Sequence, residues 1–189
     1  MSVRPILTVG HPLLRERAME VDDVASPAVQ SLIDDLIDTM RHANGAGIAA
    51  NQIGSLQRVA VMEVEHNPRY PYKPRIPLTV LVNPIITPLD HVTLAINEGC
   101  LSVPNLRGEV SRHVNVRVRY LDRDGIEHDE VLGGLTAGTF QHECDHLDGV
   151  LFLDRVTDPT TFSTWDQFEQ FHRADFIARL TVLGYAASH

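Results

Sequence analysis

The stretch from Gln141 to His146 reads Gln-His-Glu-Cys-Asp-His and decides how this chain is interpreted. It places His142 and His146 four residues apart, in a segment whose pattern predicts a helix that begins near Thr136. Residues four apart on a helix lie on the same face, so the two imidazoles can bind one metal ion. Glu143 lies beside that face, where a carboxylate can take a proton from a bound water. The pattern therefore predicts a metal-dependent hydrolase.

A solvated helix face is the alternative interpretation of this motif, because short motifs also arise by chance. The flanking residues are apolar, however, since Phe140 precedes the two histidines and Leu147 follows them. Ionisable side chains are costly to bury beside apolar residues unless a partner satisfies them. The surroundings therefore favour a metal site over a solvated face.

Length and composition are typical of one globular unit. With 189 residues, 43% of them hydrophobic and 22% charged, the chain predicts a single catalytic domain over residues 1–189. Apolar runs stay short of the ~20 residues that span a bilayer, and the start lacks a secretory apolar core. We therefore expect a cytoplasmic protein that does not contact membranes. The net charge of -9 argues against direct nucleic-acid binding, which needs a basic surface.

Hydrophobic spacing predicts the other elements of the fold. Ser26 and Pro27 form a helix start, and an apolar stripe at helical spacing continues to Asn44. Alternating and apolar runs predict strands at 58–65, 78–83, 114–120 and 126–132. We expect an α+β fold in which antiparallel sheets pack around the central His-Glu-x-x-His helix, with an N-terminal helix and a C-terminal helix.

The last helix is expected over about 164–184, because Thr164 and Gln167 match a capping box. Its predicted buried stripe consists of Phe168, Phe171, Ile177, Leu180 and Leu183. Four prolines lie between residues 66 and 77, and they predict an exposed loop between two strands.

The third metal ligand has three candidate sources. A metzincin site would need histidine where Phe152 stands and a methionine downstream of the motif, and the four methionines all lie upstream. A thermolysin-like site would take a glutamate from a later helix, for which Glu169 is the candidate. Cys100 is the third candidate, since a thiolate is a good ligand for zinc or iron. By contrast, we expect Cys144 on the opposite face of the helix from the histidines.

Three segments, in order along the chain, resemble the signature motifs of peptide deformylases. They are Gly45-Ala46-Gly47-Ile48-Ala49-Ala50-Asn51-Gln52, Glu98-Gly99-Cys100-Leu101-Ser102 and Gln141-His142-Glu143-Cys144-Asp145-His146-Leu147-Asp148-Gly149. Three motifs in the right order are far more specific than one alone. Inside them Ile48 replaces the usual leucine, an exchange that conserves side-chain volume.

The resemblance implies that Cys100, His142 and His146 bind one divalent metal ion, with water in the fourth position. It implies iron(II) as the native metal, and zinc, nickel or cobalt also suit these ligands. The implied substrate is the N-formylmethionyl end of a nascent peptide. The implied reaction is hydrolysis of the formyl group, which releases formate and a free amino terminus.

The resemblance also implies the catalytic roles. Glu143 would take the proton of the attacking water and deliver it to the departing amine. The side-chain amide of Gln52 and the backbone N–H of Leu101 would stabilise the developing oxyanion. Glu98 and Asp145 are expected to hold neighbouring groups in place through hydrogen bonds.

For the substrate, the resemblance implies an extended peptide that pairs with the backbone near Gly47 and Gly99. Arg107 matches an arginine of the family that contacts the peptide, although a solvated arginine fits the sequence equally well. We expect the methionine side chain in an apolar pocket with Ile96 and Leu135 as walls. Two more expectations concern this pocket: a further wall at Ala46, and an open floor at Gly138 and Thr139.

Some members of the family dock on the ribosome through a C-terminal helix. Here the expected helix balances acidic against basic residues, namely Asp166, Glu169 and Asp175 against Arg173 and Arg179. This balance gives no electrostatic support for binding ribosomal RNA. We therefore expect at most a transient association with the ribosome.

Overall fold

Residues 2–65 and 69–185 are described by the computed structural model of the chain. Its strands form two antiparallel sheets. One has five strands in the order β1-β2-β3-β6-β7, and the other is the β4–β5 hairpin. The strands are β1 (Gly47–Ala49), β2 (Val59–Val64), β3 (Ile76–Pro88), β4 (Thr93–Cys100), β5 (Val103–His113), β6 (Asn115–Leu121) and β7 (Glu127–Gly133).

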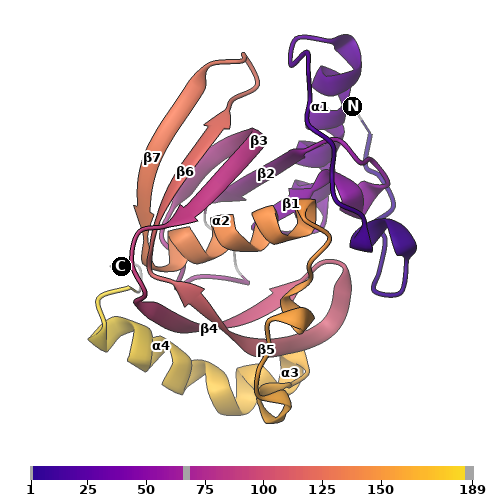
Figure 1. The fold of residues 1–189 in the computed structure, drawn as a ribbon. Helices are drawn as coiled ribbons and strands as arrows, with labels where there is room; N and C mark the ends of the chain where they lie inside the picture. The colour runs from indigo at the N-terminus through magenta and orange to yellow at the C-terminus, as the bar shows by residue number, and fades with distance from the viewer. Residues whose placement is uncertain (1, 66–68, 186–189) are drawn as a thin grey trace.

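The longest helices are α1 (Pro27–His42) and α2 (Gly134–Leu147). Figure 1 shows α2 lying across the middle of the molecule, between the five-stranded sheet and the β4–β5 hairpin. The helix α1 packs on β2 at the other side of the large sheet, through an apolar face that includes Ile33, Leu36 and Met40. The predicted α+β fold, with sheets around the His-Glu-x-x-His helix, is confirmed.

Local details of both helices differ from the prediction. The helix α1 begins at Pro27 as expected, but the Ser26 hydroxyl donates to the backbone carbonyl of Asp23 at 2.9 Å and does not cap the helix. The helix α2 begins at Gly134, two residues before Thr136, and Gly134 adopts a positive φ of 57° at the junction with β7. Short 3₁₀ turns lie at Pro12–Arg15, Ala50–Ile53, Phe152–Asp154 and Pro159–Thr161.

The β4–β5 hairpin was not among the predicted strands. Glu98 and Arg112 are buried on the face of the hairpin that contacts α2, and Arg107 is buried on its opposite face, against Trp165 and Phe168. Because these charged residues occupy positions where an amphipathic strand usually carries apolar side chains, the expected alternation of hydrophobic residues is interrupted. The hairpin therefore lacks the sequence pattern of a strand at the place where it forms the site.

The C-terminal helix contains a π turn, and part of its predicted stripe is wrong. It consists of α3 (Trp165–Gln167), a π-helical turn η5 (Phe168–His172) and α4 (Arg173–Val182). A π turn shifts the residues that follow it around the helix axis. Phe168, Phe176 and Leu180 are consequently buried, whereas Phe171 is 60% exposed and Leu183 is 50% exposed.

The described residues contain no helix that is both long and apolar enough to cross a bilayer.

Candidate active site

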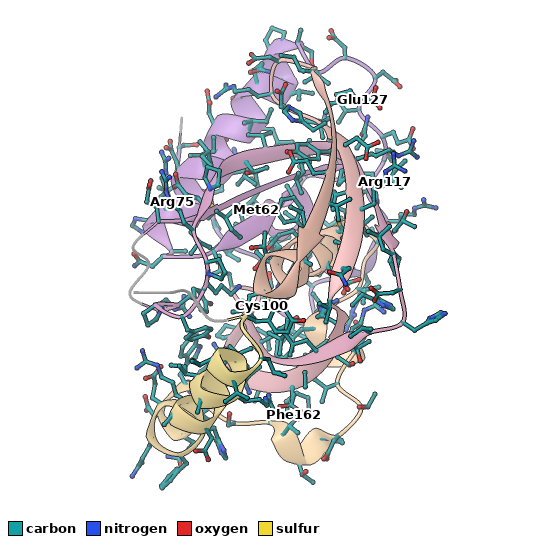
Figure 2. All side chains as sticks on the ribbon, turned by 90° about the vertical axis from the view of Figure 1, so that its left-hand side faces the viewer. Met62, Arg75, Cys100, Arg117, Glu127 and Phe162 are labelled. Atoms are coloured by element: carbon teal, nitrogen blue, oxygen red, sulfur yellow. The ribbon has the colours of Figure 1, made fainter. Side chains whose placement is uncertain are left out.

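Three groups that can bind a metal meet where the end of β4 faces α2. Cys100 is the last residue of β4, and His142 and His146 lie one turn apart on α2. Their ligating atoms all lie within 4.8 Å of one another, and the Sγ atom of Cys100 is 3.2 Å from Nε2 of His146. Cys100 lies near the middle of the molecule in Figure 2. Of the three candidate third ligands, Cys100 is the one that the fold brings to the histidines.

The other candidates lie elsewhere. Glu169 is in the π turn of the C-terminal helix, where it pairs with Arg173 at 2.8 Å. Cys144 is buried on α2, outside the group of three, and burial raises the pKa of its thiol to about 12. Phe152, at the position of a metzincin histidine, packs in a small apolar cluster with Val103 and Leu151.

A buried ionic network holds the first histidine in place. Nδ1 of His142 lies 2.8 Å from Oε2 of Glu98, and the guanidinium of Arg112 donates twice to the Glu98 carboxylate at 2.7 and 2.9 Å. Arg112 also donates to Asp145 at 2.5 Å, and Asp145 accepts two more hydrogen bonds from Arg155. Burial opposes ionisation of Glu98, but Arg112 and His142 hold its pKa well below its usual range.

The two histidines have opposite protonation tendencies. Burial lowers the pKa of His146 well below its usual range, and the neighbouring His142 and Arg112 lower it further. Burial acts in the same direction on His142, but hydrogen bonds to Cys100 and Glu98 outweigh it and raise its pKa. Since a metal binds the deprotonated forms of histidine and cysteine, metal binding here would release protons.

These residues fit a divalent metal ion. Two imidazoles and a thiolate are ligands that suit zinc, iron, nickel and cobalt. Three protein ligands also leave a position open for water or substrate, as in a catalytic site. The hydrogen bond from His142 to Glu98 provides the outer support that metal-bound histidines normally have.

Glu143 faces this group from the same helix. Its side chain is buried, and within the described residues its Oε2 atom has no hydrogen-bond partner. Burial raises the pKa of Glu143 to about 7. A Cβ atom added to Gly47 would lie 2.3 Å from Oε1 of Glu143, so only glycine leaves room for the carboxylate here. The arrangement can therefore move protons next to the metal ligands.

Gln52 is a buried residue beside Cys100. Its Oε1 accepts a hydrogen bond from the backbone N–H of Ala49 at 2.8 Å. Its Nε2 donates to the Ser102 hydroxyl at 2.9 Å and lies 3.6 Å from Sγ of Cys100. Because Ala49 fixes the oxygen, the NH₂ group is directed toward the Cys100 end of β4. Leu101 follows Cys100 and lines the same pocket.

One pocket is lined by Gln52, Cys100, Leu101, His142 and Glu143. Every residue predicted to bind the substrate lines it, namely Gly47, Gly99, Arg107, Ile96 and Leu135. Arg107 is 1% exposed, so the alternative of a solvated arginine is wrong. Its guanidinium donates to Asn97 and lies against the ring of Trp165, 4.1 Å from the centroid.

Two predictions near the pocket need correction, namely its open floor at Gly138 and the exposed loop between the prolines. A Cβ atom on Gly138 would lie 2.5 Å from Cδ1 of Ile96, so the Ile96 side chain already fills that space. The segment expected to be an exposed loop also returns to the pocket, because Tyr70 and Tyr72 are buried and Tyr70 and Lys73 line the cavity. Pro68, in the same segment, lies outside the described residues. The aromatic residues between the prolines were the available signal for burial.

The sequence model of the polypeptide deformylase family matches residues 3–162. Peptide deformylase 1 of Prochlorococcus marinus is 47% identical over 170 residues, which cover 89% of this chain and 88% of that protein. Peptide deformylase of Leptospira biflexa is 43% identical over 165 residues, which cover 86% of this chain and 92% of that protein. Among solved structures, the Met-Ala-Ser-bound class I type b peptide deformylase of Acinetobacter baumannii matches with a TM-score of 0.78 and 38% identity, over 82% of this chain and 99% of that one. The chain therefore belongs to the peptide deformylase family, whose metal-dependent enzymes remove the N-formyl group from newly made polypeptides.

Proposed function

We propose that this chain deformylates N-formylmethionyl nascent peptides with Cys100, His142 and His146 as the ligands of one divalent metal ion. The observation that carries this assignment is the meeting of their ligating atoms within 4.8 Å, beside the Glu143 carboxylate, whose Oε2 atom has no hydrogen-bond partner among the described residues. When bound, such an ion supplies Lewis acidity and lowers the pKa of a water molecule toward about 7. We propose iron(II) as the native metal, while zinc, nickel and cobalt suit the same ligands.

Glu143 is the proton-transfer residue of this proposal. It takes a proton from the water that attacks the formyl carbon, and it delivers that proton to the peptide nitrogen as the C–N bond breaks. Formate and a peptide with a free amino terminus are the products. A buried carboxyl whose pKa lies near neutrality is suited to both steps, because it neither holds nor releases its proton too strongly.

Gln52 and Leu101 stabilise the oxygen of the formyl group as it gains negative charge. The contact of the Gln52 oxygen with Ala49 leaves its NH₂ group as the donor near Cys100. A donor fixed in advance loses little energy to reorganisation during the reaction. The backbone N–H of Leu101 is the second donor of this oxyanion site.

The peptide lies along Gly47 and Gly99, and its methionine side chain enters the pocket between Ile96 and Leu135. Glycine at both positions lets the peptide backbone approach closely. The Acinetobacter baumannii relative was crystallised with Met-Ala-Ser, a peptide of the kind that this reaction releases. Arg107, held by Asn97 and Trp165, orients the peptide at the side of the pocket.

We place this reaction in the cytoplasm, where nascent peptides emerge, with at most a transient association with the ribosome. The exposed acidic and basic residues of the C-terminal helix include the Glu169–Arg173 pair, which neutralises itself. This helix therefore offers little net positive charge to ribosomal RNA.

The test is formate release from formyl-Met-Ala-Ser by protein prepared without oxygen and loaded with iron(II). Glu143→Gln is expected to keep the metal and to lose turnover, because the amide cannot accept the proton. Glu169→Gln is the matched control and is expected to leave turnover unchanged. Loss of activity in Glu169→Gln with retention in Glu143→Gln would instead support a thermolysin-like site.

A further inference from the structure

Lys73 is the single lysine of the chain, and it lies in the pocket that the proposed function assigns to the methionine side chain. It comes from the segment between β2 and β3, far from the three motifs in the sequence. Its ammonium donates to the Thr139 hydroxyl at 2.9 Å and lies 5.0 Å from the ring centroid of Tyr70. Thr139 in turn donates to the backbone carbonyl of Leu135 at 3.1 Å, one turn earlier on α2.

The ammonium has more hydrogen-bonding capacity than these contacts use. A lysine ammonium carries three N–H donors, and among the described residues Thr139 accepts one of them. The Lys73 side chain is half-buried, and desolvation by the surrounding protein lowers its pKa to about 8. An ammonium donor that loses contact with water and gains no acceptor is costly. The pocket therefore combines the apolar walls Ile96 and Leu135 with a donor-rich lysine.

We propose that Lys73 is a specificity-determining residue, which adapts the pocket to N-formyl peptides whose first side chain has the length of methionine and ends in a strong hydrogen-bond acceptor. Methionine sulfoxide is such a side chain, because its sulfinyl oxygen is a strong acceptor, whereas a thioether sulfur is a weak one. This inference rests on the proposed function. The hydrolysis is the same for both peptides: water adds to the formyl carbon, the C–N bond breaks, and formate leaves.

The position of the donor favours this ligand over an apolar one. An apolar side chain in the pocket removes water from Lys73 and offers no replacement acceptor. A sulfoxide oxygen accepts from the ammonium, while its methylene groups contact Ile96 and Leu135. Ile96 already fills the space next to Gly138, whereas Lys73 and Thr139 line the pocket and can contact the end of the side chain.

The test compares kcat/KM for formyl-Met(O)-Ala-Ser with kcat/KM for formyl-norleucyl-Ala-Ser, whose side chain has a similar length and no acceptor. In the wild-type protein we expect the sulfoxide peptide to be used at least as well as the norleucine peptide. Lys73→Met, which keeps the length and removes the donors, is expected to lower this ratio by about tenfold or more. Arg75→Met removes a charge from the same segment at an exposed position (Figure 2) and is expected to leave the ratio unchanged.

A smaller change in Lys73→Met, or an equal change in Arg75→Met, would overturn the inference. If the wild-type protein hydrolyses formyl-Met-Ala-Ser while these ratios do not move, the inference fails and the proposed function stands. If it hydrolyses none of the formyl peptides, the proposed function fails as well.

If Lys73→Met does not fold, the wild-type protein can be tested by NMR. Because Lys73 is the single lysine, labelling with ¹⁵N-lysine gives one side-chain signal in the zinc-loaded protein. Met(O)-Ala-Ser is expected to shift that signal more than norleucyl-Ala-Ser does, and equal shifts would overturn the inference.

Discussion

Replacing Arg112 by methionine is expected to destabilise the metal-free protein strongly, although Arg112 is not a proposed metal ligand. The guanidinium is 3% exposed and bridges two carboxylates, Glu98 at 2.7 Å and Asp145 at 2.5 Å. Methionine keeps much of the aliphatic length and removes the charge. In this variant Asp145 would still contact Arg155. Glu98 would lose Arg112 and would retain its contact with His142.

The magnitude follows from burial. Removing one partner of a buried ion pair costs about 3–5 kcal/mol, because the remaining charge stays buried without compensation. In a protein of this size 1 kcal/mol shifts the melting temperature by about 2–4 °C, so we expect a decrease of about 6–20 °C. Arg117→Met is the matched control, because Arg117 forms a comparable pair with Asp129 on the exposed surface at the edge of Figure 2. Exposed pairs contribute at most about 1 kcal/mol.

The assay is thermal and denaturant unfolding of both variants in the presence of a chelator, so that metal binding does not add to stability. The pH adds a second check. Because the folded protein holds the pKa of Glu98 below its ordinary value of about 4.5, Glu98 contributes stability above that pH, and this contribution is lost as the pH falls. The difference between the wild type and Arg112→Met is therefore expected to shrink below about pH 4.5. Equal destabilisation by Arg112→Met and Arg117→Met would contradict the larger contribution expected of the buried ion pairs.

Three further predictions concern the site itself. Gly47→Ala adds a methyl group that would lie 2.3 Å from Oε1 of Glu143. Formate release is therefore expected to fall about 100-fold or more, while the metal content stays unchanged. Wild-type activity in this variant would contradict the close approach of Gly47 and Glu143. In metal-free protein at about pH 8, a thiol reagent is expected to label Cys100 and not Cys144, because burial raises the pKa of Cys144 to about 12. Added metal is expected to protect Cys100 from the reagent. Labelling of both thiols in the native protein would contradict the predicted difference between Cys100 and Cys144. Gln52→Leu is expected to lower kcat by about 100- to 1,000-fold with little change in KM, and an effect confined to KM would exclude its role in stabilising the oxyanion.

The elements with regular periodicity could be predicted from the sequence. The apolar stripe of α1 and the alternation of β6 are local patterns, and the structure has both elements within a few residues of the expected bounds. The spacing of His142 and His146 placed them on one helix face, because helix geometry is also local. Cys100 could not be assigned from spacing alone, since its approach to the histidines depends on how β4 packs against α2.

The rest depends on contacts between distant segments. Arg112 and Glu98 interrupt the hydrophobic pattern of the hairpin because they satisfy each other, and pairing of this kind has no signature in a single sequence. The inward turn of Lys73 depends on Thr139, 66 residues away along the chain. The π turn that exposes Phe171 likewise has the sequence pattern of an ordinary α-helix, so the sequence does not reveal it.

X-ray absorption at the zinc edge of the zinc-loaded protein would identify the ligands of the metal. We expect one sulfur at about 2.3 Å and two imidazole nitrogens at about 2.0–2.1 Å. The sulfur signal should disappear in Cys100→Ser and persist in Cys144→Ser. A spectrum without sulfur, or one whose sulfur persists in Cys100→Ser, would contradict the assignment of Cys100 as a metal ligand.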